Sequence, residues 1–522
     1  MAAALMSRTA KLLIFLILVS QFLFFGFIAL HRFVDGDEGF YLLASRLVLL
    51  HKKPYLDFVY EQAPLLPYVY ASWMKLFGIT WVSAKLFAAL LTALLGSLLY
   101  AEVCRQTGKI IVGLSAVLMF AASGMIFGYF PVVKTYSLAV LLLFAAYTLA
   151  ARMCETSHWW LFAGSGFLFS LSVATRSYLV VVMPLFLWWI FKKSNPRERL
   201  ASLTWFLGAF SFGMLPCLYF FIASPQLFVF NNLSIHGIQT DHGGLVGMWE
   251  QKLFVLLQTF LGRGEGNGLQ TSIVFFVSLG LLSSSRKDTS SPRLAFQIAV
   301  VIGIVSLLPT PVVGQYFGYC IPFLLLSAVC GANNLVEEME PGRSRVAAVA
   351  ACAVVFAAYL AASVPDFRRY LVTGDEVPGI ALSVDKNDLR LQQILEVSRA
   401  IDRVVVPGEP VAGWPGYLFQ TKAVPFPGFE TDFAIYLANM LNSEQRARYH
   451  ILSPDDIRAK FASHQPRVVV LRDEQAAAGK GGERWQKILR IDDGFRRSLQ
   501  EHGYTVVRTI GQTSIYVCCS QY

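Results

Sequence analysis

An apolar run followed at once by a group of acids begins this chain: LLIFLILVSQFLFFGFIAL over residues 12–30, then HRFVDGDEGFY over residues 31–41. An apolar run of roughly 18 residues or more has the length of a helix that crosses about 30 Å of hydrocarbon. Arg8 and Lys11 precede the run, and no small-residue cleavage site follows it. We therefore expect a retained first span with the N-terminus inside.

Comparable apolar runs recur as far as Pro365. Hydrophobic residues make up 55% of the 522 residues and charged residues only 15%, against about 25% in an ordinary soluble protein. A single soluble core of this composition is excluded, and we predict a polytopic α-helical membrane protein of about eleven spans. The predicted spans lie at approximately residues 12–30, 82–101, 110–128, 134–151, 159–175, 178–191, 201–223, 268–284, 294–309, 317–335 and 346–364.

The connecting segments alternate in charge, which predicts the topology. Basic residues lie in every second connection, as in Arg105 with Lys109, Arg152, and the stretch 192–199. The net charge of +10 is thus explained by orientation in the membrane, and nucleic-acid binding is set aside. The long segments at residues 31–81 and 224–267 are then outer loops. Residues 1–365 form the predicted transmembrane domain and residues 366–522 an extracytoplasmic domain.

The last 150 or so residues lack spanning runs and are typical of a soluble α/β module. Ser453 followed by Pro454 and two aspartates is a natural helix start, because serine caps a helix and acids favour its N-terminus. The predicted elements are a helix through residues 391–398, a strand at 403–406, a helix from 453, a strand at 467–471, a helix at 483–501, and strands at 504–510 and 514–518.

Three carboxylates, those of Asp35, Asp37 and Glu38, lie at the boundary between the first span and the first outer loop. Carboxylates this close shift one another's pKa by repulsion, and one of them could act as a general base. A solvated acidic boundary is about as common an explanation, so spacing alone leaves both interpretations open.

Cations at the outer ends of spans contradict the positive-inside bias, which makes Lys134 and Arg176 candidates for a functional site. The alternative is that their side chains reach out to the lipid headgroups. His236 and Arg263 lie in the second outer loop, where an ordinary loop residue is the simpler explanation. Tyr316 begins the tenth span and could line a lipid groove, although an aromatic belt explains it as well.

The first outer loop resembles that of a known family. Asp37-Glu38 after the first span, Gly39-Phe40-Tyr41-Leu42-Leu43-Ala44, Lys53-Pro54-Tyr55 and Ala63-Pro64-Leu65-Leu66-Pro67-Tyr68 are similar to the corresponding loop of GT-C-fold glycosyltransferases. The group in question comprises protein O-mannosyltransferases, aminoarabinose transferases and Rgt-like enzymes. The close match covers about residues 31–80, and the arrangement of spans with an outer C-terminal domain agrees more loosely over the whole chain.

This resemblance implies a membrane glycosyltransferase that uses a polyprenyl- or dolichyl-phosphate sugar donor. It implies that Asp37 is the catalytic base, with Glu38 as its neighbour and Asp35 as the weaker choice. A bacterial inner membrane is the location it implies, with the C-terminal domain in the periplasm or outside. The acceptor could be a lipid, a glycan or a protein.

The chain also departs from that group. Aminoarabinose transferases carry a lysine before a double proline, whereas here Gln62 and Ala63 precede Pro64. The positive charge that binds the donor phosphate would then have to come from Lys53 or Lys52, or from Lys134 and Arg176. No His/Cys/Asp cluster has the spacing of a metal site, but Asp37 and Glu38 could bind a hydrated divalent ion, so a metal requirement stays open.

The resulting hypothesis is inverting glycosyl transfer at the outer face, with Asp37 activating the acceptor and Lys134 and Arg176 stabilising the lipid phosphate. The main rival is a transporter or flippase, which also combines many spans with a few charges. A receptor or scaffold, and a ligase or polymerase of surface glycans, are further alternatives. The position of the acids directly after the first span favours the glycosyltransferase.

Overall fold

The computed structural model describes residues 8–153, 155–156, 158–235, 244–261, 266–284, 290–309, 312–373, 390–431, 438–472 and 493–518. The chain forms two compact units, each built from segments that are far apart in the sequence. Unit 1 comprises Met1–Ala29, Leu86–Pro216 and Thr240–Ile380, and unit 2 comprises Leu30–Lys85, Cys217–Gln239 and Ala381–Tyr522.

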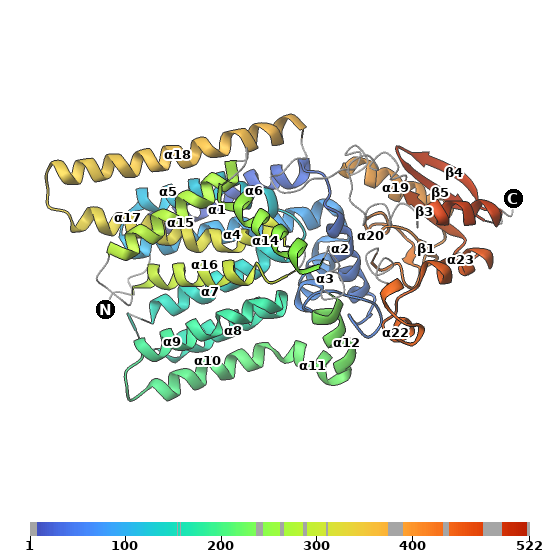
Figure 1. The fold of residues 1–522 in the computed structure, drawn as a ribbon, viewed down its shortest axis with the longest axis horizontal. Helices are drawn as coiled ribbons and strands as arrows, with labels where there is room; N and C mark the ends of the chain where they lie inside the picture. The colour runs from blue at the N-terminus through green and yellow to red at the C-terminus, as the bar shows by residue number, and fades with distance from the viewer. Residues whose placement is uncertain are drawn as a thin grey trace. The chain divides into compact units, whose positions relative to one another are not determined.

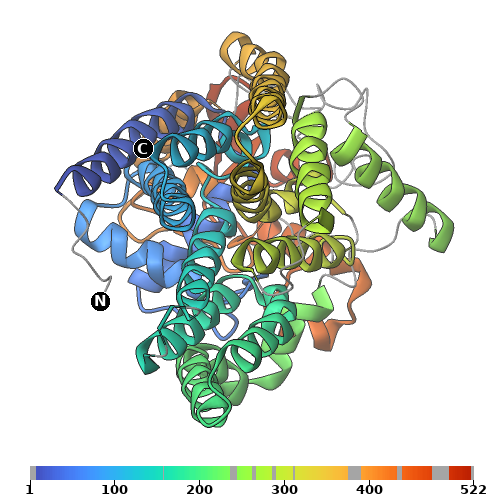
Figure 2. The same ribbon diagram turned by 90° about the vertical axis from the view of Figure 1, so that its left-hand side faces the viewer.

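Unit 1 is a bundle of helices, seen side by side in Figure 1 and nearly end-on in Figure 2. Its elements are α1 (Arg8–His31), α4 (Trp81–Thr107), α5 (Ile110–Ala122), α6 (Gly124–Tyr129), α7 (Thr135–Arg152), α8 (Trp159–Thr175), η1 (Ser177–Val182), α9 (Met183–Lys193), α10 (Arg199–Gly213), α14 (Gly244–Leu261), α15 (Gly266–Ser284), α16 (Ser291–Val305), η3 (Gly314–Cys320), α17 (Ile321–Glu338) and α18 (Arg343–Thr373). The first residues of α4 and the last two of α1 belong to unit 2.

All eleven predicted apolar segments lie on helices of the described chain. Five of these helices are long and apolar enough to cross a membrane, and α10 with α11 (Leu215–Ala223) forms a sixth if this pair, bent by 52°, is one span. Four shorter apolar helices, α5, α8, the apolar part of α15 and α16, accompany them. The predicted fold class, a helical integral membrane protein with several spans, is confirmed.

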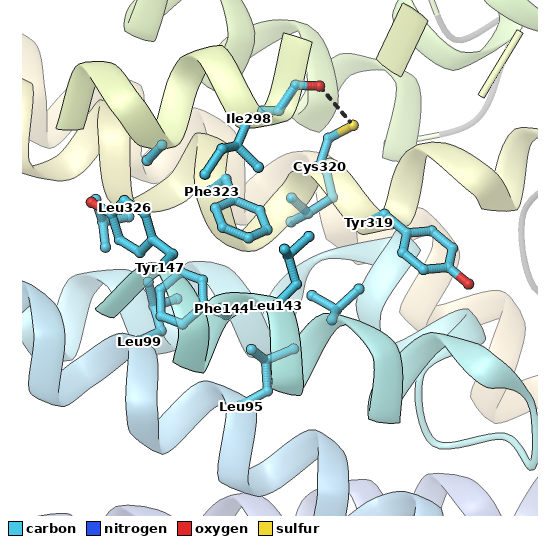
Figure 3. Close-up of a cluster of buried hydrophobic side chains, with 14 of the residues drawn as sticks. Leu95, Leu99, Leu143, Phe144, Tyr147, Ile298, Tyr319, Cys320, Phe323 and Leu326 are labelled. Atoms are coloured by element: carbon cyan, nitrogen blue, oxygen red, sulfur yellow. Dashed lines mark hydrogen bonds between the residues drawn. The ribbon is translucent and has the colours of Figure 1, made fainter. Parts of the chain in front are cut away.

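Part of the core of unit 1 is built from large side chains of α4, α7, α16, η3 and α17 (Figure 3). The rings of Phe144 and Phe323 lie with centroids 5.2 Å apart, and Cys320 Sγ donates to the Ala299 carbonyl at 3.2 Å. Elsewhere in the bundle, α8 and α10 approach closely at Gly166, where a Cβ atom would lie 2.2 Å from the Phe206 carbonyl oxygen. In a membrane there is no hydrophobic driving force between helices, so small residues that let two backbones approach closely favour their packing.

A glutamine from α15 stabilises the break between α5 and α6. Gln270 Oε1 accepts the Gly124 N–H at 2.9 Å, while Gln270 Nε2 donates to the carbonyls of Ala122 at 2.9 Å and Tyr359 at 3.1 Å. A broken helix inside hydrocarbon exposes backbone groups that water cannot reach, so another group must bind them. The buried amide of Gln270 supplies both a donor and an acceptor there.

Unit 2 combines the segment after the first apolar helix with Cys217–Gln239 and the C-terminal region. Its helical elements are α2 (Gly36–Leu49), α3 (Leu65–Phe77), most of α11, α12 (Pro225–Val229), the π-helical turn η2 (Phe230–Ser234), α19 (Leu391–Val404), α20 (Pro415–Leu418), η5 (Ala438–Met440), α22 (Ser443–Arg448), α23 (Pro454–Ala462) and a helix over 493–501. Its strands are β1 (Pro410–Ala412), β2 (Val424–Pro425), β3 (Val468–Arg472), β4 (Thr505–Ile510) and β5 (Thr513–Val517).

The strands form one mixed sheet in the order β2-β1-β3-β5-β4. Strand β1 pairs in parallel with both β2 and β3, whereas β5 runs antiparallel to β3 and β4. The predicted helix at Ser453 is confirmed as α23, which Ser453 caps while Asp456 binds back to the Ser453 backbone. The predicted strands at 467–471, 504–510 and 514–518 are confirmed as β3, β4 and β5.

One predicted strand is wrong. Residues 403–406 do not form a strand, because α19 continues through Val404 and the first strand begins only at Pro410. The run of valines favours a strand locally, but Ile394, Val397 and Ile401 form a buried helical stripe that reaches this point. Tertiary burial thus outweighs the β-propensity of the valines. The start of the predicted helix at 483 and Cys519 lie outside the described residues.

Candidate functional site

The three acids that follow the first apolar helix form the first turn of α2. Asp35 is the N-cap of α2, and its Oδ1 accepts the Asp37 N–H at 3.0 Å. Glu38 Oε2 in turn accepts the Asp35 N–H at 2.9 Å, which completes a capping box. These bonds satisfy N–H groups that have no partner within the helix, so the acids fix where α2 begins.

Glu38 also forms a fully buried ion pair with Lys85 at the start of α4. Lys85 Nζ lies 3.1 Å from Glu38 Oε1 and 2.9 Å from Oε2, and neither side chain is exposed to solvent. Burying a charge is unfavourable unless it is paired and hydrogen-bonded, and the Glu38 carboxylate meets both conditions. Burial together with this carboxylate raises the pKa of the Tyr70 hydroxyl well above its usual value.

Lys85 is a residue that the sequence analysis missed. It lies within an apolar predicted span, and a lysine there is a functional candidate by the same argument that selected Lys134. The signal was therefore present in the sequence. Its partner could not be read from the sequence because Glu38 and Lys85 are 47 positions apart.

Asp37 differs from its two neighbours because it is exposed. Asp35 retains 11% side-chain exposure, and its Oδ2 lies 3.8 Å from Nη2 of the buried Arg32. Of the three carboxylates, that of Asp37 is thus the most accessible to a molecule in solution. The first turn of α2 presents it on a backbone that the Asp35 and Glu38 side chains hold.

Lys53 and Gln62 lie further along the same outer segment. Lys53 Nζ donates to the Tyr219 hydroxyl at 3.0 Å, and this bond, with the nearby Asp57 carboxylate as a smaller cause, raises the pKa of Lys53. The Gln62 carbonyl accepts a hydrogen bond from the Tyr55 hydroxyl. Both residues belong to unit 2 with Asp37. The phosphate contact of Lys53 and the place of Gln62 among the candidate site residues stay predictions.

Arg176 and Lys134 lie in unit 1, near a group of tyrosines. Arg176 follows the last residue of α8, and its guanidinium carbon lies 5.2 Å from the centre of the Tyr178 ring and 5.4 Å from that of Tyr316. These are cation–π distances. Tyr316, the third residue of η3, therefore contacts a predicted site residue.

Lys134 approaches the same tyrosines through its neighbour in the chain. Lys134 precedes α7 and is buried, with 5% exposure. The hydroxyls of Thr135 and Tyr319 lie 3.1 Å apart, and the Tyr319 and Tyr178 rings have centroids 5.8 Å apart. The structure thus brings the start of α7 and the end of α8 together around Tyr319.

Other predicted site residues are not placed. His236 and Arg263 lie outside the described residues. The predicted convergence of Asp37 with Lys134 and Arg176 joins residues of different units and remains a prediction. Among the described residues, no group of three or more His, Cys, Asp or Glu side chains could hold a metal ion. A divalent ion at Asp37 and Glu38 also remains a prediction, and Glu38 is already bound to Lys85 there.

Part of the chain matches the model of a known protein family. Residues 61–221 match the model of dolichyl-phosphate-mannose-protein mannosyltransferases. The matched range runs from just before α3 through most of α11, so it contains Lys85, Lys134 and Arg176 but begins after the turn with Asp37. No match to a curated protein was found at the sequence level.

Solved structures show the fold of the whole chain. ArnT from Cupriavidus metallidurans bound to undecaprenyl phosphate is similar with a TM-score of 0.64 at 12% identity, over 97% of this chain and 98% of that chain. The apo form of the same ArnT gives a TM-score of 0.63 at 12% identity, over 98% of each chain. At this identity the likeness establishes an ArnT-like fold. The resemblance expected from the sequence is thus confirmed for residues 61–221, which match the mannosyltransferase model, and for the fold of the chain, which is ArnT-like.

Proposed function

We propose that this protein transfers a sugar from a polyprenyl-phosphate donor to an extracytoplasmic acceptor, with inversion and with Asp37 as the general base. In this reaction the acceptor hydroxyl oxygen forms a bond to the anomeric carbon of the sugar. The bond between that carbon and the phosphate oxygen breaks, and the polyprenyl phosphate leaves with the electron pair. The proton of the acceptor hydroxyl moves to the Asp37 carboxylate.

The exposure of Asp37 is the single observation that carries the assignment of the base. A general base must come within hydrogen-bond reach of the proton that it removes. Asp37 is exposed on the first turn of α2, whereas Glu38 has no exposed surface and binds Lys85. Glu38 and Asp35 would then assist by holding the turn on which Asp37 lies.

The lipid-phosphate donor is supported by the family and the fold. The matching family is named for a dolichyl-phosphate sugar donor, and the ArnT with the same fold was solved with undecaprenyl phosphate. The leaving phosphate needs positive charge, and the cluster of Arg176, Tyr178 and Tyr316 offers a guanidinium that aromatic rings hold in place. Lys134 and Lys53 are the other proposed phosphate contacts.

We further propose the orientation that the loop charges predict. The N-terminus would be cytoplasmic, the first outer loop with Asp37 would face the periplasm or exterior, and residues 366–522 would lie on that same side. The membrane would be a bacterial inner membrane. In this orientation the exposed acid and the C-terminal sheet would lie on one face of the membrane.

The test is transfer by purified protein from a panel of radiolabelled polyprenyl-phosphate sugars, comparing wild type with Asp37→Asn. Loss of a general base lowers the rate by about 10²- to 10⁴-fold, so we expect a loss of this size in Asp37→Asn. Asp455→Asn is a matched control, because Asp455 is also an exposed acid in the first turn of a helix that begins with a capping box. It should leave the rate unchanged.

Two results would contradict the proposal. Transfer by Asp37→Asn at the wild-type rate would remove Asp37 as the base. If the wild type moved an intact lipid-linked sugar across vesicle membranes without cleaving it, the transporter or flippase would be favoured instead.

A further inference from the structure

The carboxyl edge of the C-terminal sheet has the topology of a ligand-binding edge. Strand β1 lies between β2 and β3 and is parallel to both, so the chain leaves β1 toward one neighbour and returns to the other. In open α/β sheets, ligands bind at the carboxyl ends of strands where the order reverses in this way. Gly413 and Trp414 follow β1 directly, and the segment to Glu430 follows β2.

This edge contacts the helix that carries the acids. A Cβ atom on Gly39 would lie only 2.4 Å from the Gly416 backbone nitrogen, so α2 and α20 meet backbone to backbone. Further along α2, the buried Arg46 donates to the carbonyls of Leu418 at 2.8 Å and Ala423 at 2.7 Å. The turn after β1 is thereby fixed against the first turns of α2, within two residues of Asp37.

The ring of Trp414 lies over the point of contact. It is half-buried, and a Cβ atom on Gly416 would meet its Cη2 and Cζ3 atoms at 2.2 Å. The Tyr417 ring packs against it edge-on, with centroids 5.0 Å apart at 83°. Because Trp414 covers Gly416 and Gly416 touches Gly39, a large aromatic surface lies beside the turn that presents Asp37.

A carboxyl group, that of Glu430, lies in the segment after the neighbouring strand β2, which ends at Pro425. Glu430 Oε2 accepts the Gly428 N–H at 2.8 Å. Burial raises the pKa of Glu430 to about 7, although the hydrogen bonds and the charge of Lys52 in the first outer loop act in the opposite direction. Near neutral pH this group can both accept and donate a hydrogen bond.

We infer that the carboxyl edge of this sheet is the acceptor subsite, where Trp414 stacks on a sugar ring of the acceptor and Glu430 binds one of its hydroxyls. This inference rests on the proposed function and gives it an acceptor class, a glycan or glycolipid. An aromatic face matches the apolar C–H face of a sugar ring, and few, well-placed polar groups supply specificity. A peptide acceptor would instead pair with an exposed sheet edge through its backbone.

The experiment uses the full chain in a detergent that contains no sugar. Binding of methyl glucoside, methyl galactoside and methyl mannoside is measured by ligand-detected NMR for wild type, Trp414→Leu, Glu430→Gln and Trp205→Leu. Trp205 is an exposed tryptophan on α10 of unit 1, so Trp205→Leu is the matched control. With an active donor, the Michaelis constants for donor and glycan acceptor are measured on the same four proteins.

We expect at least one glycoside to bind the wild type and the Trp205→Leu control equally. Trp414→Leu should weaken that binding by about ten-fold, the equivalent of roughly 1.4 kcal/mol, and should raise the KM for the glycan acceptor more than the KM for the donor. Glu430→Gln should have a smaller effect in the same direction, because an amide still binds hydroxyls.

The inference is overturned if none of the glycosides binds the wild type, if Trp414→Leu binds them as the control does, or if only serine- or threonine-containing peptides accept the sugar. Failure of the proposed function gives a different result. In that case no lipid-linked sugar is cleaved by the wild type, while binding of the glycosides still depends on Trp414.

Discussion

Compared side by side, the first turn of α2 and the cluster around Arg176 hold charge next to apolar side chains in different ways. In the first, the Glu38 carboxylate is enclosed, paired with Lys85 and used as a helix cap. In the second, the Arg176 guanidinium lies against the faces of Tyr178 and Tyr316. A fully buried ion pair is rigid, and removal of one partner strongly destabilises the fold. A cation on aromatic rings is held more weakly and can approach a ligand. This difference suits a structural role for Glu38 and a binding role for Arg176.

The variant that most directly tests the structural role of the buried ion pair is Lys85→Met. The substitution leaves the Glu38 carboxylate buried without its cation, which should lower the free energy of unfolding by about 3–5 kcal/mol. Thermal unfolding in detergent measures the change. In the double variant Glu38→Gln, Lys85→Met the buried charge is absent and the glutamine can still cap α2, so most of the stability should return. Equal unfolding temperatures for Lys85→Met and the wild type would show that the pair is not structural.

The backbone contact beside this turn predicts the next largest effect. A Cβ on Gly39 would overlap the Gly416 backbone, so Gly39→Ala should destabilise unit 2 by about 1–3 kcal/mol and lower transfer by displacing the first turn. Gly36→Ala is the control, because a Cβ there meets nothing within 4 Å. Unfolding and transfer are measured on both variants. Equal behaviour of the two would mean that α2 and α20 do not pack as described.

The aromatic cluster should tolerate change better than the buried pair. Arg176→Lys retains the positive charge but loses the flat stacking surface, and we expect a loss of roughly 0.5–2 kcal/mol in donor binding, seen as a higher donor KM. Tyr316→Leu should act in the same direction through Arg176. A drop in thermal stability as large as that of Lys85→Met would remove the distinction between the two clusters.

The last prediction concerns pH. Burial raises the folded-state pKa of Glu430 to about 7 from an ordinary value of 4.5, so the folded protein binds a proton that the unfolded chain releases. This contribution to stability is full below about pH 4.5 and is lost as the pH rises toward 7. Glu430→Gln should flatten the fall in unfolding temperature between these values. An unchanged slope in the variant would indicate that other groups cause it.

Much of the fold could be predicted from the sequence because it depends on local patterns. The apolar runs fixed the helices of unit 1, and the Ser453 cap fixed the start of α23. The strand expected at residues 403–406 failed because α19 extends through Val404 on the buried stripe of Ile394, Val397 and Ile401, and burial depends on what the helix packs against. The short strand β1 gave no pattern long enough to detect.

The candidate site was predictable in part. The acids near residue 37 and the cations at 134 and 176 could be selected because charges at the ends of apolar runs stand out. The different roles of the three acids could not be predicted, because they arise from the capping box and from Lys85, 47 positions after Glu38. Trp414 was missed for a similar reason, because only folding brings Gly416 against Gly39.

The amide of Gln270 has a consequence for anyone who recombines this protein with its relatives. The bend after α5 is stabilised by a residue 146 positions downstream of Gly124, on a different helix. In a chimera that exchanges the first half of the bundle without residue 270, the backbone groups at this bend would lose their hydrogen-bond partner. Crossover points should therefore keep both segments from one parent.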